Sequence, residues 1–170
     1  MSSYYFTIIG TRDNPLYEVE FSSFKPSSSS SSSAISSSSA GSNQPHIPGK
    51  SQFTPKVREI LPFIANSSLD IIEDSQWSTN QFNLGRIDSF YGLLVNAFIT
   101  QGNIKFILCY DNPSNASSSQ KYDENLIRQF FIDVNDLYVK CLLNPFYSVN
   151  DAIISSDFDL KVKLLARKYL

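Results

Sequence analysis

Two short strand-like runs separated by turn-forming residues open this chain. Aromatic and β-branched side chains fill residues 4–9, and a second run covers residues 16–21. Gly10 and the Asp13-Asn14-Pro15 cluster between them favour a turn, so the pattern predicts a β-hairpin. The hairpin begins almost at Met1, which leaves no room for a signal peptide. We therefore expect a protein that is made and kept in the cytosol.

Residues 22–54 break this pattern with a Ser-rich composition punctuated by Pro and Gly. Such a segment cannot bury enough apolar surface to offset its ordering entropy, so it is predicted to be disordered. Strands precede it and a helix follows it, and closing a long loop costs little more than closing a short one. We therefore interpret it as a loop insertion within one domain that spans residues 1–170, a one-domain length.

A first helix is predicted to start at Thr54-Pro55, with Thr as the N-cap and Pro in the first turn. Apolar residues at helical spacing continue it to about Asp74. Pro62 lies within this stretch. It either kinks the helix or marks its true start, and both possibilities stay open.

Three strands are predicted next, over residues 82–89, 93–100 and 104–111. Gln101-Gly102-Asn103 supplies a tight hairpin between the last two. The third strand is apolar at nearly every position, which is typical of a central strand that is covered on both faces.

Two helices are predicted to end the chain. Apolar residues recur at i, i+3, i+4 and i+7 from residue 126 to residue 143, where Asn144-Pro145 stops the helix. Ser156 with Asp159 predicts a capped helix over 157–169, packed through Phe158, Val162, Leu165 and Leu164. The element order β-β-α-β-β-β-α-α predicts an α+β fold: a five-stranded antiparallel sheet with the first helix on one face and the last two on the other.

The inventory of reactive groups argues against an enzyme. The single histidine, His46, lies in the Ser-rich insertion, so no Ser/His or Cys/His pair can be assembled from the remaining sequence. Cys109 and Cys141 sit in apolar patterns and are predicted to be reduced core thiols rather than zinc ligands. We expect no catalytic residue, no cofactor and no metal. The net charge of −2 without clustered Lys or Arg disfavours nucleic-acid binding, and no apolar run is long enough to insert in a bilayer.

Clustered carboxylates are the remaining candidates for a site. Asp70, Glu73 and Asp74 close the predicted first helix, where acids oppose the helix macrodipole. They are either ordinary surface acids or a docking patch for a partner that supplies cations. Two further pairs are interpreted as the solvated sides of a strand and of a helix: Glu18 with Glu20, and Asp133 with Asp136.

Several co-linear motifs outside the insertion resemble the sedlin family. They are DNPLYEVEF (13–21), LDIIED (69–74) with Trp77, DVNDLY (133–138), NPFY (144–147) and SSDFD (155–159). The Ser-rich insertion is longer than the family's usual loop and looks fungal, and Pro62 is a second departure. The resemblance implies a longin fold, which has the architecture predicted above.

The resemblance also implies a role. Sedlin-like proteins are small, non-enzymatic adaptor subunits of the TRAPP vesicle-tethering complex, which acts between the endoplasmic reticulum (ER) and the Golgi and in autophagy. The expected partners are other TRAPP subunits and, indirectly, a Rab GTPase, because the complex is an exchange factor whose exchange surface lies on other subunits. The expected location is cytoplasmic, peripheral to ER and Golgi membranes. Asp70 matches an acidic family position implicated in docking a large subunit.

Two alternatives stay open. The alternative to a TRAPP subunit is another longin-type trafficking component, such as a clathrin-adaptor small chain or a longin SNARE. A SNARE would need a heptad helix and a membrane anchor, whereas this chain stops at Leu170. The Ser tract at residues 27–39 is interpreted either as a neutral expansion or as a tail whose phosphorylation adds negative charge near a partner surface.

Overall fold

The computed structural model describes residues 3–23, 51–111 and 124–170. Their order of elements is the predicted one: β1 (Ser3–Ile9), β2 (Pro15–Ser22), α1 (Pro55–Ser78), β3 (Asn83–Phe90), β4 (Leu93–Ile99), β5 (Lys105–Asp111), α2 (Glu124–Leu142) and α3 (Ser156–Tyr169).

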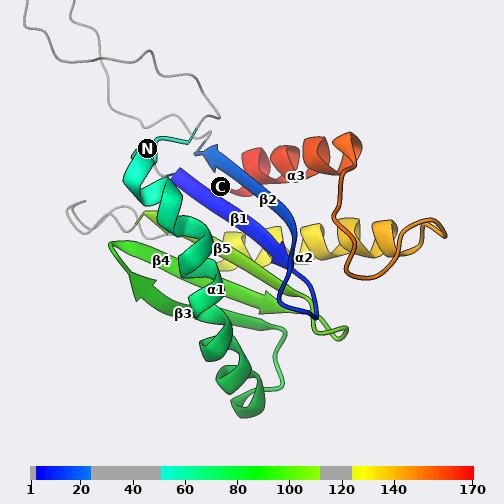
Figure 1. Cartoon of the computed structure of the whole chain (residues 1–170), viewed down its shortest axis with the longest axis horizontal. Coiled ribbons are helices and arrows are strands. Elements are labelled where there is room, and N and C mark those ends of the chain that lie inside the picture. Colours follow the sequence, from blue (N-terminus) through cyan, green and yellow to red (C-terminus); the bar gives the residue numbers. More distant parts are fainter. Residues whose placement is uncertain (1–2, 24–50, 112–123) are drawn as a thin grey trace, which may run out of the picture.

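The five strands form one antiparallel sheet in the order β2-β1-β5-β4-β3 (Figure 1). β5 lies at its centre, as its apolar sequence predicts. The predicted β4–β5 hairpin is also present, since Thr100 donates its N–H to the Ile104 carbonyl (2.9 Å) and Asn103 donates to that of Thr100 (3.0 Å). Asn103 adopts a φ of 58°, a conformation that Asn tolerates in turns.

Each face of the sheet has its own core. α1 covers one face, where Ile64, Ile72 and other aliphatic side chains meet Val95, Ile107 and Cys109. α2 and α3 cover the opposite face, where Phe130 and Phe158 join a core rich in aromatic rings. Figure 1 shows the three layers, with α1 in front of the sheet and α2 and α3 behind it. The predicted distribution of helices is confirmed.

α1 begins where the sequence predicts and runs without a break through Pro62. The hydroxyl of Thr54, the N-cap, accepts the N–H of Val57 (3.4 Å), and Pro55 is the first helical residue. The alternative start near Pro62 is wrong. The Pro62 ring is exposed on the outer side of the helix, and apolar packing on the opposite side holds the helix together around the missing N–H group.

The start of α3 differs from the prediction by one residue. Ser155, not Ser156, is the N-cap, and its hydroxyl accepts the N–H of Phe158 (3.3 Å). Phe158 and Val162 are buried as expected, whereas Leu164 is exposed and Ala166 takes the buried position. From the sequence, Ser155 and Ser156 are equally good N-cap candidates. Packing of the apolar face of the helix decides between them.

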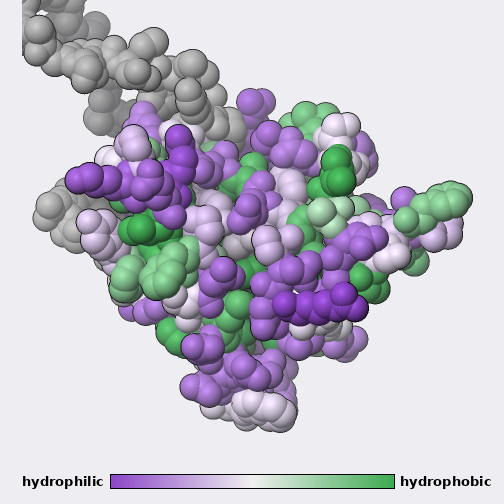
Figure 2. Space-filling model, in the orientation of Figure 1, coloured by the Kyte–Doolittle hydropathy of each residue, from purple (hydrophilic) through white to green (hydrophobic). Residues whose placement is uncertain are grey.

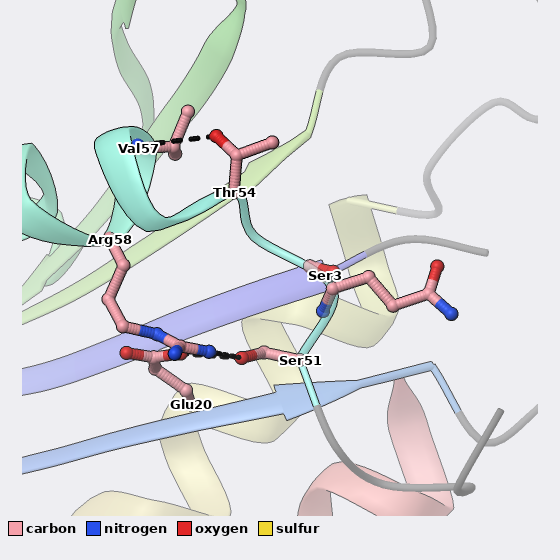
Figure 3. Close-up of polar contacts among 7 residues, drawn as sticks. Ser3, Glu20, Ser51, Thr54, Val57 and Arg58 are labelled. Carbon is pink, nitrogen blue, oxygen red and sulfur yellow. Dashed lines mark hydrogen bonds and ion pairs between the residues drawn. The ribbon is translucent and has the colours of Figure 1, made fainter. Parts of the chain in front are cut away.

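The predicted insertion is too wide at both ends. Ser22 is the last residue of β2, and Phe53 is buried against the core beneath α1. A polar cluster fixes the segment before α1, because Arg58 contacts both the Glu20 carboxylate (2.9 Å) and the Ser51 hydroxyl (3.1 Å) (Figure 3). Residues 24–50, which hold His46 and the Ser tract, lie outside the described residues, and their disorder stays a prediction.

A second polar cluster joins the β1–β2 turn to the loop between α2 and α3. The Asn150 side chain accepts the Thr11 N–H (2.8 Å) and donates to the Thr11 hydroxyl (2.9 Å), while Asn14 donates to the Asn150 carbonyl (3.0 Å). The approach is so close that a Cβ on Gly10 would lie 2.5 Å from the Asn150 Oδ1. A side chain at position 10 would therefore push the Asn150 and Asn14 side chains out of this contact.

Candidate docking surface on α1

The outward face of α1 carries three carboxylates between two exposed aromatic rings. Phe63 is 62% exposed and Trp77 is 82% exposed. Asp70, Glu73 and Asp74 are also exposed, and the spacing of 63, 70, 73, 74 and 77 places all five side chains along one side of a helix. We call this set the acidic-aromatic stripe.

The stripe is not neutralised within the described residues. Neither Asp70 nor Glu73 nor Asp74 forms an ion pair in this part of the chain. Carboxylates three and four positions apart on a helix repel one another by a few tenths of a kcal/mol. The arrangement therefore costs a little free energy of folding that a cationic partner would offset.

The position of the carboxylates corrects one expectation. α1 does not end near Asp74 but continues to Ser78, so these acids lie before the last turn rather than at the terminus. Ile72 is the last buried residue of the helix, and beyond it α1 extends past the sheet (Figure 1). Figure 2 shows hydrophilic side chains over this end of α1, at the bottom of the view.

The other predicted solvated carboxylates are mostly engaged by the fold. Tyr5 donates its hydroxyl to Glu18 (2.7 Å), and Glu20 pairs with Arg58. Burial, followed by the bond to Glu18, raises the pKa of Tyr5 well above its ordinary value. Glu18 is exposed, as the interpretation of a solvated face predicts, and Glu20 is half-buried, but both carboxylates also bind partners within the fold.

Asp133 is likewise a packing residue. It accepts hydrogen bonds from the Tyr169 hydroxyl (2.7 Å) and from Gln129 (2.9 Å), which fastens α3 to α2. Partial burial acts to raise the pKa of Asp133, but these hydrogen bonds outweigh it and the pKa is lowered. Asp136, its predicted companion, is exposed as expected.

The remaining reactive groups show packing roles. Cys109 is a free, buried thiol whose pKa is raised to about 12 by burial, and Cys141 is free and half-buried. The described part of the chain contains no group of three side chains able to hold a metal ion. No helix in that part is long and apolar enough to cross a membrane.

The sequence prediction named the acids of the stripe but not its aromatic ends. Trp77 served only as part of a family motif, and Phe63 was counted in neither a core nor a site. A signal existed: Phe63 and Trp77 lie seven residues before and after Asp70, which is helical spacing, and they fall outside the apolar core positions.

Comparison with known proteins agrees with the motifs. The sedlin family model matches residues 8–168. The chain is 35% identical to trafficking protein particle complex subunit 20 of Saccharomyces cerevisiae, over 98% of this chain and 97% of that protein. It is 34% identical to the transport protein particle 20 kDa subunit of Schizosaccharomyces pombe, over 98% of both chains. It is also 35% identical to the probable trafficking protein particle complex subunit 2 of Drosophila melanogaster, over 100% of this chain and 99% of that protein. The chain belongs to the sedlin family.

Proposed function

We propose that this protein is a non-enzymatic adaptor subunit of the trafficking protein particle (TRAPP) complex. Within that complex it would support assembly of the Rab exchange factor, in ER-to-Golgi vesicle tethering and in autophagy. It would act in the cytoplasm at the surface of ER and Golgi membranes. Full-length similarity to proteins named as subunits of that particle supports the assignment.

The observation that carries the docking part of this proposal is the acidic-aromatic stripe. Exposed Phe and Trp rings supply large apolar contact area, and interfaces are enriched in such aromatic anchors. Three carboxylates between the rings favour a partner surface that carries Lys or Arg. An acidic partner surface would repel them, and an apolar one would bury them without counter-ions. The exposure and spacing of these five side chains on α1 support the proposal that the stripe is the recognition surface.

Charge reversal at the centre of the stripe tests the site. Asp70→Lys should leave the free energy of unfolding within about 0.5 kcal/mol of the wild type, because the side chain is exposed and has no ion pair with any described residue. It should weaken binding of a large TRAPP subunit by at least tenfold, measured by quantitative co-purification of the tagged chain. The small TRAPP subunits should stay bound.

Glu59→Lys is the matched control. Glu59 is another exposed acid on the outward side of α1 and has no ion pair with a described residue, but it lies three turns before Asp70. It should bind normally. Equal binding by Asp70→Lys and the wild type would reject the stripe as the docking site. Failure of the wild-type chain to co-purify with any TRAPP subunit would reject the adaptor function itself.

A further inference from the structure

The side of α2 that faces away from α3 is half-exposed and apolar. α3 packs along one side of α2, where Leu137 and Cys141 join the aromatic core. On the opposite side Ile132, Val139 and Leu142 remain partly exposed. Their spacing of seven and three residues places them along one line of the helix. α2 therefore has one flank that a helix covers and another that no element of the described chain covers.

This uncovered flank borders a groove of about 480 Å³. Val139 and Leu142 form its α2 wall, Phe82, Phe98 and Ile104 form its sheet wall, and Val149 lies at its end. Phe82 is 47% exposed and Val139 is 43% exposed. We call the space between these walls the α2 groove.

Two guanidinium groups lie near the N-terminal end of this flank, away from Leu142. Arg128 precedes Ile132 by one helical turn, on the same side of α2. Arg86 of β3 pairs with Asn96 of β4, whose side chain accepts the Tyr110 hydroxyl within the core on the α2 face. Arg86 therefore lies on that face too, and α2 and β3 are in contact. Both arginines are exposed and form no ion pair within the described residues.

We propose that the α2 groove binds an amphipathic helix of a partner protein, with apolar side chains against Val139 and Phe82 and acidic side chains toward Arg128 and Arg86. From Arg128 to Leu142 the flank is about 21 Å long, which equals about four turns of a helix. Apolar anchors at i, i+3, i+4 and i+7 are the usual way in which a helix fills such a groove. The bound helix would pack along this side of α2, as α3 packs along the opposite side.

The two exposed arginines favour an occupant that carries carboxylates at one end. An acidic end on the partner helix pairs both cations and fixes its direction. The α2 groove lies across the sheet from the acidic-aromatic stripe, so an adaptor could hold two partners at once.

Photo-crosslinking within the intact complex tests the groove. The photoreactive residue p-benzoylphenylalanine replaces Val139 in the full chain, and matched chains carry it at Leu164, an exposed position on α3. After irradiation, mass spectrometry of the digested complex identifies the crosslinked segment. Val139→p-benzoylphenylalanine should capture a segment of another subunit with apolar residues at helical spacing and Asp or Glu toward one end. The Leu164 chain should not capture that segment.

Charge reversal then tests the orientation of the bound helix along the α2 groove. Arg128→Glu combined with Arg86→Glu should lower the crosslink yield at position 139 at least tenfold, whereas Arg12→Glu, an exposed cation of the β1–β2 turn, should leave it unchanged. All variants should keep the thermal midpoint of the parent.

The proposal is overturned by no crosslink at position 139, by a crosslink to a second copy or to lipid, or by a captured segment without acidic residues. It rests on the proposed adaptor function in one respect, the presence of a partner. A chain that co-purifies with TRAPP subunits but gives no such crosslink overturns this inference alone.

Discussion

The cores on the two faces of the sheet contain different types of side chain. Among the described residues, most of the buried aromatic side chains lie on the side of α2 and α3, and only Tyr5 and Phe53 lie in the core beneath α1. On the aromatic side, bonds from Tyr17 to Asp159 and from Tyr169 to Asp133 also tie the helices in place. The face beneath α1 is mostly aliphatic, and the ion pair between α1 and the sheet, from Arg58 to Glu20, lies near the N-terminus of the helix.

This difference separates the part of the molecule that contributes most to stability from the part that we propose to bind a partner. The aromatic face buries large rings in edge-to-face and stacked pairs, such as Phe6 with Phe130 at 5.3 Å between ring centroids. α1 buries smaller, mostly aliphatic side chains and leaves its outer side free for an exposed acidic surface. Substitutions on the aromatic face should therefore change folding, and substitutions on the outer side of α1 should change binding alone.

The largest expected effect comes from the aromatic core. Phe130→Ala should lower the free energy of unfolding by about 3–5 kcal/mol, because it removes a fully buried ring at the centre of several aromatic pairs. Ile64→Ala beneath α1 should cost less, about 2–3 kcal/mol. Urea denaturation measures both. A larger loss for Ile64→Ala would break the comparison, and Phe130→Leu replaces the first variant where the alanine chain does not fold.

A glycine substitution should have an intermediate effect. Gly10→Ala should lower the free energy of unfolding by about 1–3 kcal/mol, since its Cβ would press on the side chains of Asn150 and Asn14. Gly102→Ala is the control, because its nearest neighbour would be 3.9 Å away. That change should be neutral or slightly stabilising. Equal thermal midpoints for the two variants would show that the turn and the α2–α3 loop are not tightly joined.

A smaller and pH-dependent effect should come from Asp133. Its lowered pKa means that the folded state favours the ionised carboxylate. The stabilisation is therefore present above the unfolded-state pKa of about 3.9 and is lost as the pH falls through the folded-state value. Asp133→Asn should cost about 1–2 kcal/mol at pH 7. That cost should shrink toward zero in strong acid, as followed by denaturation at several pH values. Asp136→Asn, on an exposed acid of the same helix, should cost almost nothing at any pH.

Much of the fold could be predicted because local patterns and tertiary structure agree. The apolar run of β5 required cover on both faces, and the central position of that strand supplies it. Thr54-Pro55 marked the start of α1 through chemistry confined to four residues. Where two local choices were equal, as for Ser155 and Ser156, packing of Phe158 decided and the sequence could not.

The candidate surfaces were less predictable. Asp133 looked like a wet-side acid because the helical pattern of α2 shows which side is apolar, but not that α3 brings Tyr169 to its polar side. For the same reason the α2 groove could not be foreseen, since its walls come from α2, from Phe82 before β3, and from β4 with the turn that follows it. The acids of the stripe were named from sequence because they are neighbours on one helix.

The position of β1 within the sheet has a consequence for biosynthesis. β1 pairs with β2 directly but also with β5, which follows it by about a hundred residues and lies beyond the Ser-rich segment. Asn150, still later in the chain, locks the first turn. During translation the opening hairpin thus emerges with an apolar edge that cannot be paired until β5 has left the ribosome. Contacts so distant in sequence slow folding, so the β1 edge that pairs with β5 stays open for most of the synthesis of this chain.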